Sequence, residues 1–436
     1  MKRYDSYKNS GVEWIGEVPE HWEVCKIKRL SVVKRGASPR PIENPIYFDD
    51  NGQYAWVRIS DVTDSKKYLY STTQKLSKLG ASLSVKMHSG EIFLSIAGTV
   101  GKPIITKIDC CIHDGFVWFP NLKLEPEFLY YVFMSGRPYL GLGKLGTQLN
   151  LNTETVGYIS IPIPEGKEII EIVSYLDSRC GEVDKVISTQ EKRISLLQEL
   201  KQSLITHAVT KGLNPDVKMK DSGIEWIGEV PEHWGAYRIK YNTFLKGRIG
   251  WQGLKASEFI DEGYCLITGT DFDNKGGVNW DTCYRISEER FNEDRLLHVK
   301  EGDILITKDG TVGKLALIKQ LPEPASLNSH LLIVRQISNI MNNYFLYYCL
   351  LCSIFKEFTE YNQTGSIMNS ISQDLFSYFK CYAPPITEQQ EIASYLDKRC
   401  AQIDASICKA QREIELLQEY KQSLITEVVT GKRKVC

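Results

Sequence analysis

The sequence predicts two α/β (α+β) domains separated by two long antiparallel coiled-coil helices, related by a pseudo-twofold internal repeat. Three repeated segments predict this fold class. SGVEWIGEVPEHW at 10–22 returns at 222–234 with one difference, and GTVGK at 98–102 returns at 310–314. A third block, 172–206, returns at 392–426 with roughly 20 of 35 positions identical. Similarity nearly vanishes between these blocks, so two copies share a frame and differ in their variable regions.

The third repeated block predicts a long helix with one apolar seam. Apolar residues recur there at the a and d positions of a heptad, and charged residues lie mostly outside them. The seam residues are Leu176, Val183, Ile187, Ile194, Leu197 and Leu204 in the first copy and Leu396, Ile403, Ile407, Ile414, Leu417 and Leu424 in the second. So narrow a stripe favours a helix-to-helix seam over the alternative of two helices packed separately on their own domains.

The connectivity predicts that the two helices are antiparallel. The second variable region begins after the first helix and finishes before the second, so antiparallel helices bring both of its attachment points to one end of the coil. Prolines at 162 and 164, and at 384 and 385, mark the starts of the helices, because proline suits a boundary or a first turn. The first SGVEWIGEVPEHW segment precedes the first variable region, so we expect it to meet the C-terminus and close a nearly circular arrangement.

The variable regions predict mixed domains of strands and helices. Apolar stretches predict strands at 54–60, 91–98 and 111–119 in the first region and at 264–270, 303–309 and 331–337 in the second. The segments 127–136 and 342–359 predict helices.

The composition is that of a globular protein. The chain has 436 residues, 42% of them hydrophobic and 25% charged, which excludes wholesale disorder and collagen-like repeats. A net charge of -1 argues against a uniformly basic nucleic-acid binder. Residues 24–107 nevertheless carry 14 basic and 6 acidic side chains, including Lys34, Arg35 and Arg40. Such a patch suits contact with phosphates, with a solvated lysine-rich face as the alternative.

The sequence predicts a cytoplasmic protein with reduced thiols. The N-terminal segment lacks the apolar core of a signal peptide, and no stretch has the length and apolarity of a membrane span. The 12 cysteines are therefore expected to be buried thiols. Cys349 and Cys352 have a spacing found in zinc sites, but their apolar helical surroundings favour core packing. The DCCIHD sequence at 109–114 is a weaker metal candidate still.

No motif predicts catalysis. GLGKLG at 141–146 fits a dinucleotide fingerprint but follows a helical segment where a strand is needed. GTVGK lacks two features of a phosphate loop, so we expect a strand-to-strand turn. NPIY at 44–47 resembles the base-holding tetrapeptide of adenine methyltransferases, but no glycine-rich cofactor loop accompanies it. We therefore expect no enzyme activity, no cofactor and no metal.

The repeated frame resembles the DNA-specificity subunit of type I restriction-modification systems. Each variable region follows a G-x-E-W-I-G-x-x-P-x-H-W segment and precedes a P-x-x-E-Q-x-x-I-x-x-Y-L-D block and a helix ending K-Q-S-L-I-T. The block at 384–397 is a close match, whereas the block at 162–177 shows lysine and glutamate where the glutamate-glutamine pair is usual. The resemblance covers essentially the whole chain.

The resemblance implies a non-catalytic subunit with two target-recognition domains, each reading one half of a split sequence in double-stranded DNA. It also implies that the helices set the gap and dock two methyltransferase subunits, with restriction and translocase subunits joining through the complex. The corresponding parts are 1–23, 24–161 (first domain), 162–235, 236–384 (second domain) and 385–436. A coiled-coil adaptor is the alternative, and a fused DNA methyltransferase or nuclease is a further one.

The candidate DNA contacts are basic and amide side chains of the two domains, because lysine and arginine bind phosphates and amides read base edges. They are Lys34, Arg35, Arg40, Arg58, Lys102, His113, Gln148 and Asn150 in the first domain and Lys246, Arg248, Lys308, Lys314, His330, Gln363 and Asn369 in the second. Any one of them could instead cap a turn.

Overall fold

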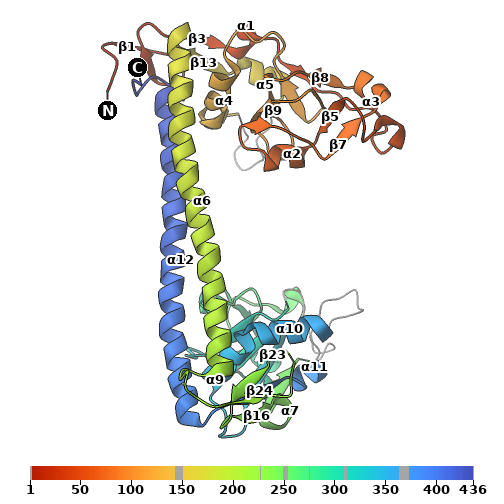
Figure 1. The fold of residues 1–436 in the computed structure, drawn as a ribbon, viewed down its shortest axis with the longest axis vertical. Helices are drawn as coiled ribbons and strands as arrows, with labels where there is room; N and C mark the ends of the chain where they lie inside the picture. The colour runs from red at the N-terminus through yellow and green to blue at the C-terminus, as the bar shows by residue number, and fades with distance from the viewer. Residues whose placement is uncertain are drawn as a thin grey trace. The chain divides into compact units, whose positions relative to one another are not determined.

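The computed structural model describes residues 2–142, 151–225, 227–248, 254–273, 275–308, 312–362 and 373–435. The chain forms two compact units. The first consists of Met1–Glu191 and Gln411–Cys436, and the second consists of Lys192–Ala410. Each unit contains one variable region and a part of each long helix (Figure 1). Within the described ranges, no helix is both long and apolar enough to cross a membrane.

The variable region of the first unit contains two mixed sheets. The five-stranded sheet has the order β4-β12-β9-β10-β6, with the bounds Lys34–Arg35, Phe116–Trp118, Ile92–Ser95, Pro103–Thr106 and Tyr68–Leu69. The four-stranded sheet has the order β7-β5-β11-β8, with the bounds Gln74–Leu76, Tyr54–Val57, Cys110–Ile112 and Val85–Met87. The predicted strands at 54–60 and 91–98 are confirmed as β5 and β9. The predicted strand at 111–119 is divided, because the chain turns where the Phe116 N–H donates to the His113 carbonyl at 3.1 Å.

The variable region also contains short helices. They are α1 (Ile27–Leu30), α2 (Ile59–Asp64), α3 (Lys78–Ser82), α4 (Pro126–Met134) and α5 (Thr153–Tyr158). α4 confirms the predicted helix at 127–136 and buries its Phe-Leu-Tyr-Tyr sequence at 128–131 in the core. That core also contains residues of both long helices, such as Leu176 and Leu424.

The variable region of the second unit repeats this plan. Its sheets have the orders β17-β23-β20-β21 (Thr243–Gly247, Leu331–Gln336, Ile304–Thr307, Leu315–Leu317) and β19-β18-β22 (Tyr284–Ile286, Tyr264–Ile267, Ala325–Leu327). Its helices are α7 (Ile239–Asn242), α8 (Glu288–Asn292), α9 (Asn343–Leu351), α10 (Ser353–Asn362) and α11 (Gln373–Ser377). The three predicted strands are confirmed as β18, β20 and β23. The predicted helix at 342–359 is divided into α9 and α10, because the backbone is extended at Cys352.

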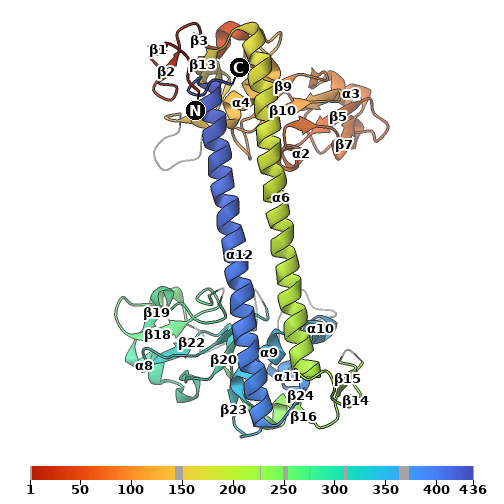
Figure 2. The same ribbon diagram turned by 60° about the vertical axis from the view of Figure 1, so that its left-hand side comes forward.

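The long helices α6 (Gly166–Lys211) and α12 (Ile386–Val429) run antiparallel. In the first unit the Lys421 ammonium on α12 contacts both carboxylate oxygens of Asp184 on α6, at 2.6 and 2.8 Å. In the second unit Lys201 on α6 makes the equivalent pair with Asp404 on α12, at 2.7 Å. The start of each helix thus pairs with the end of the other, and Figure 2 shows the helices side by side.

Burial along the helices follows the heptad. Leu176, Leu396 and Leu424 are at most 1% exposed where a variable region packs on the helices, and Val183 and Ile403 are buried as well. The remaining seam residues are half-buried, which is expected where only two helices meet; they are Ile187, Ile194, Leu197, Leu204, Ile407, Ile414 and Leu417.

The repeated EWIGEVPEHW segments form two-stranded sheets that hold the starts of the long helices. These sheets are β1-β2 (Tyr7–Asn9, Glu17–Pro19) and β14-β15 (Met219–Asp221, Glu229–Pro231). The Trp22 indole N–H donates to the Glu168 carboxylate at 2.8 Å, and the Trp234 N–H donates to Glu388 at 3.2 Å. Both tryptophans are buried, so each segment is fixed to the first turn of the helix that its own copy provides.

This arrangement corrects the alignment of the P-x-x-E-Q block. Because Glu168 and Glu388 bind equivalent tryptophans, the glutamate of the pair is present in both copies, and the departure lies one residue later. There Ile169 replaces Gln389, whose side chain donates to the Ile340 and Pro384 carbonyls at 2.8 and 2.7 Å.

One further strand pairing completes the frame of each copy. β3 (Glu23–Lys26) pairs with β13 (Ser160–Ile163), and β16 (Gly235–Arg238) pairs with β24 (Lys380–Ala383). The expected meeting of the termini is confirmed within the first unit. The Lys434 N–H donates to the Lys2 carbonyl at 3.1 Å, and the Tyr7 hydroxyl donates to the Gly431 carbonyl at 3.0 Å (Figure 2).

Candidate nucleic-acid interface

Three of the candidate DNA contacts in the first variable region gather around Asp114, in the turn between β11 and β12. The Arg40 guanidinium pairs with the Asp114 carboxylate at 2.8 Å, and Arg35 Nε donates to the Asp114 carbonyl at 2.5 Å. The Ser38 hydroxyl donates to the same carboxylate at 2.8 Å, and this bond, supported by the two arginines, lowers the pKa of Asp114. The carboxylate and the backbone carbonyl of Asp114 therefore hold one guanidinium group each, those of Arg40 and Arg35, beside His113.

The basic side chains around Asp114 are accessible to solvent. The Arg40 side chain is 77% exposed, and Lys34 and Arg35 are exposed on β4. A guanidinium with one carboxylate partner keeps donors for a phosphate or a base edge. This exposed cluster is thus chemically suited to contact with DNA.

Arg58 and Lys102 lie at α2. Arg58 precedes the helix, and its guanidinium donates to the Thr73 hydroxyl. Lys102 is the last residue of GTVGK, and its ammonium donates to the Thr63 carbonyl in α2 at 2.9 Å. Burial lowers the pKa of Lys102. Arg58 thus binds the segment before β7, and Lys102 binds α2, so both side chains already have partners within the domain.

The first GTVGK segment is the turn of a β-hairpin, and the described end of the second segment leads into the equivalent strand. In the first unit β9 and β10 are antiparallel, and the Gly101 N–H donates to the Ser95 carbonyl at 2.8 Å, which confirms the expected strand-to-strand turn. In the second unit β20 and β21 are antiparallel, and the Gly313 N–H donates to the Thr307 carbonyl at 2.9 Å. Lys314 is exposed at the end of this second hairpin.

The other described candidates of the second variable region lie on its four-stranded sheet and the loops beside it. The Lys308 N–H donates to the carbonyl of the exposed residue His330 at 2.9 Å, which joins their two loops. Lys246 on β17 pairs with Asp294 at 2.9 Å. Gln148, Asn150, Gln363 and Asn369 lie outside the described residues.

Arg248 is placed differently from the expectation for a DNA contact. Its side chain is fully buried, and its three nitrogens donate to the Leu327 carbonyl, the Glu293 carboxylate and the Ser326 hydroxyl at 3.2–3.3 Å. A buried guanidinium is retained only when it is paired and hydrogen-bonded, as here. Arg248 therefore stabilises the inside of its domain, and we leave it out of the interface.

A pair of exposed lysine-tyrosine contacts was missed in the sequence. The Lys28 ammonium lies 3.7 Å from the ring centroid of Tyr158, and Lys240 lies 5.6 Å from that of Tyr378. These tyrosines are 50% and 63% exposed. Each stands two residues before the last strand of its variable region, so comparison of the two copies could have found them. A basic side chain beside an accessible ring suits contact with a nucleic acid.

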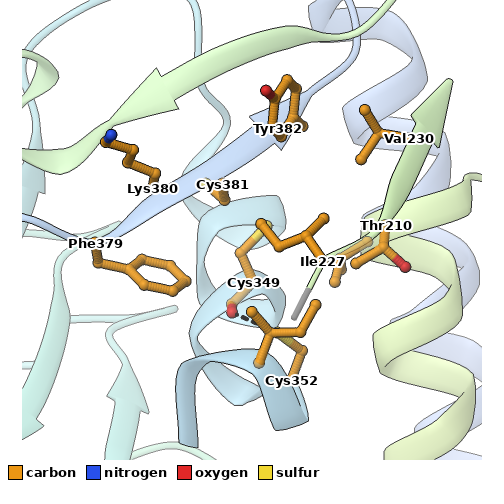
Figure 3. Close-up of a pocket in the computed structure, with 11 residues that line it drawn as sticks. Thr210, Ile227, Val230, Cys349, Cys352, Phe379, Lys380, Cys381 and Tyr382 are labelled. Carbon is orange, nitrogen blue, oxygen red and sulfur yellow. Dashed lines mark hydrogen bonds between the residues drawn. The ribbon is translucent and has the colours of Figure 1, made fainter. Parts of the chain in front are cut away.

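Three of the described cysteines line a small cavity in the second unit. Cys349, Cys352 and Cys381 line a cavity of about 10 Å³ near the end of α6, which has room for about one water molecule (Figure 3). Burial raises the pKa of Cys352 to about 11, which keeps its thiol protonated. Cys349 and Cys352 belong to the hydrophobic core, as expected. Within the described ranges, no three potential metal ligands lie close enough together to hold a metal ion, and this applies also to Cys110, Cys111 and His113.

Comparisons with known proteins point to one family. The profile of the family described as "Type I restriction modification DNA specificity domain" matches residues 19–190 and 250–416. The type I restriction enzyme MjaVIII specificity subunit of Methanocaldococcus jannaschii is 26% identical over 96% of this chain and 94% of its own length. The type I restriction enzyme EcoBI specificity subunit of Escherichia coli is 22% identical over 65% of this chain and 60% of its own.

The fold has a counterpart among solved structures. A chain from a study of complex assembly and conformational transition of the type I R-M system aligns with a TM-score of 0.71 at 17% identity. The alignment covers 94% of this chain and 98% of that chain.

Proposed function

The chain belongs to the family of type I restriction modification DNA specificity domains, and on this premise we propose that it is the non-catalytic specificity subunit of such a complex, acting on cytoplasmic DNA. In this proposal the first variable domain (24–161) reads one half of a bipartite target and the second variable domain (236–384) reads the other. The coil formed by α6 and α12 sets the gap, so the half-site centres are expected about one helical turn, roughly 34 Å, apart.

The observation that carries the proposal is the division of each copy into a constant frame and a variable domain. The frames bind their tryptophans, aspartates and lysines in the same way in both units. Outside the shared GTVGK and Phe-Leu-Tyr-Tyr sequences, the two variable domains have different sequences. Different loops on one frame suit the reading of two different half-sites, because base-edge contacts specify sequence and phosphate contacts only position.

Exchange of one domain tests the proposal. Residues 24–161 are replaced by the corresponding region of a relative, and the methylated sequence is read by methylome sequencing of a host that expresses the complete system. One half of the target is expected to change while the other stays the same. Exchange of 236–384 is the matched control and should change the opposite half. A change in both halves after a single exchange would contradict independent reading.

The helices also carry a duplicated surface suited to a partner. Leu196 and Leu200 on α6 are 64% and 53% exposed, and the equivalent Leu416 and Tyr420 on α12 are 49% and 48% exposed. Apolar side chains grouped on a helix surface favour association with another protein. We propose that each pair docks one methyltransferase subunit, with restriction and translocase subunits joining through the assembled complex.

The adaptor alternative differs in its prediction for DNA. A coiled-coil adaptor would not retard any duplex DNA, even with the methyltransferase present, whereas the specificity subunit should do so in that complex. A titration of the isolated chain with S-adenosylmethionine tests the alternative of a fused methyltransferase, which binding of this cofactor would support.

A further inference from the structure

The K-Q-S-L-I-T sequence near the end of each long helix contacts the variable domain beside it. Its glutamines, Gln202 and Gln422, occupy the same position in the two copies. In the first unit, Gln422 Nε2 on α12 donates to the Met134 carbonyl at 3.1 Å and also to the Ser135 carbonyl. Both acceptors lie at the C-terminus of α4, where the last carbonyls of a helix lack partners within the helix. A side chain from the second copy thus caps a helix of the first variable domain.

The second unit contains the equivalent contact, with the roles of the two copies exchanged. Gln202 Nε2 on α6 donates to the Leu351 carbonyl, which ends α9, at 3.0 Å. The Thr206 hydroxyl of the same motif accepts the Ser353 N–H at 3.2 Å. Here a side chain from the first copy caps a helix of the second variable domain.

Each of these capped helices is also bound to the long helix of its own copy. The Tyr131 hydroxyl on α4 donates to Asp177 on α6 at 2.5 Å, and Lys67 also contacts this carboxylate. The Tyr348 hydroxyl on α9 donates to Asp397 on α12 at 2.8 Å. Both tyrosines are 4% exposed and end the Phe-Leu-Tyr-Tyr sequence that the two domains share. Two anchors on two different long helices fix the direction of α4, and likewise that of α9.

We propose that Gln422 and Gln202 are positioning residues that act across the repeat, so that Gln422 orients the first variable domain and Gln202 orients the second. The acceptors are backbone carbonyls, which every sequence provides. This explains how one constant glutamine can hold domains whose other residues differ. The consequence for target reading rests on the proposed function, whereas the mechanical coupling does not.

Hydrogen exchange of the full chain, measured by mass spectrometry, tests the coupling. Gln422→Glu preserves the shape of the side chain but replaces its amide donor by a carboxylate that faces carbonyl oxygens. We expect exchange at the end of α4, where the Ser135 and Gly136 amides close the last turn, to become roughly 2- to 10-fold faster, as for a lost hydrogen bond. The end of α9 should be unchanged, and Gln202→Glu should produce the reverse pattern.

Gln418→Glu is the matched control, because it makes the same charge change one turn away on α12. It should leave exchange at α4 unchanged. Two outcomes would overturn the proposal: unchanged exchange at α4 in Gln422→Glu, or equal acceleration at α4 and α9.

Methylome sequencing adds the functional readout. Gln422→Glu should relax base preference only in the half that the exchange of 24–161 assigns to the first variable domain. Relaxation of both halves, or of the opposite half alone, would refute positioning across the repeat. If the wild-type complex itself modified no bipartite target, the proposed function would fail, while the hydrogen-exchange result would still decide whether the glutamines hold the domains.

Discussion

The environment of His113 favours its neutral form. Its Nδ1 accepts the Gly115 N–H at 2.8 Å, and its ring lies 4.4 Å from that of Phe116. Burial lowers the pKa of His113 below the ordinary value of 6.5, while Asp114 opposes the shift and Arg35 supports it. Protonation would also remove the acceptor that holds the turn between β11 and β12.

The free energy of unfolding of the first unit should therefore fall in mild acid. Above pH 6.5 both the folded and unfolded chains hold a neutral His113; as the pH falls through 6.5, the unfolded chain binds a proton that the folded chain resists, so stability is lost. His113→Gln keeps a hydrogen-bond acceptor and cannot titrate, so in this variant the free energy of unfolding should fall less as the pH is lowered. Hydrogen exchange of β11 and β12 from about pH 7.5 to about pH 5, corrected for intrinsic rates, measures the difference. Equal pH dependence in the variant and the wild type would contradict this account.

The basic residues show what a sequence can and cannot predict at this scale. The exposure of Arg40 accords with the local excess of positive charge. The burial of Arg248 could not be foreseen, because its partners Glu293, Ser326 and Leu327 lie 45 to 79 residues away along the chain. Charge patterning identifies cations, but only the tertiary fold decides which of them still have free donors.

At the scale of elements, local patterns predicted most of the structure. The heptads predicted the long helices, and the connectivity predicted their opposite directions. The division of 342–359 at Cys352 was not predicted, because an apolar segment has no periodicity to mark a break between two buried helices. Nor was the capping by Gln422, because it joins α12 to α4 across 287 residues of sequence and ends on backbone atoms.

The coil predicts the gap between half-sites. One heptad inserted after Leu200 in α6, with a matching heptad after Ala405 in α12, lengthens both helices by about 10 Å and preserves the apolar seam. The placement keeps Lys201 and Asp404 paired. Because a base pair rises about 3.4 Å, the preferred gap should lengthen by a small whole number of base pairs, with both half-sites unchanged. Methylome sequencing reads the gap. Tight binding with the original gap would refute the idea that the helices set the spacing.

At the scale of the whole molecule, the duplication should determine the number of partners. An element that is repeated about a pseudo-twofold axis presents two equivalent surfaces to identical subunits. The pairs Leu196 with Leu200 and Leu416 with Tyr420 occupy equivalent sequence positions in the two copies, and each pair lies in a different unit. One specificity chain is therefore expected to bind two methyltransferase subunits, so that each half-site has a catalytic centre of its own.

Charged substitutions in these pairs test that number. Burying a leucine at an interface contributes about 1.5–3 kcal/mol, so Leu196→Asp with Leu200→Asp should weaken one docking surface by roughly 100-fold or more. Native mass measurement of the co-expressed complex should then show one methyltransferase instead of two, and so should Leu416→Asp with Tyr420→Asp. Ile170→Asp is the control, because Ile170 is 65% exposed on α6 but its counterpart in the other copy is Gln390. If the variant with all four substitutions still bound two methyltransferase subunits, the docking surface would lie elsewhere. If the wild-type chain bound only one methyltransferase subunit at saturation, the two-surface proposal itself would be wrong.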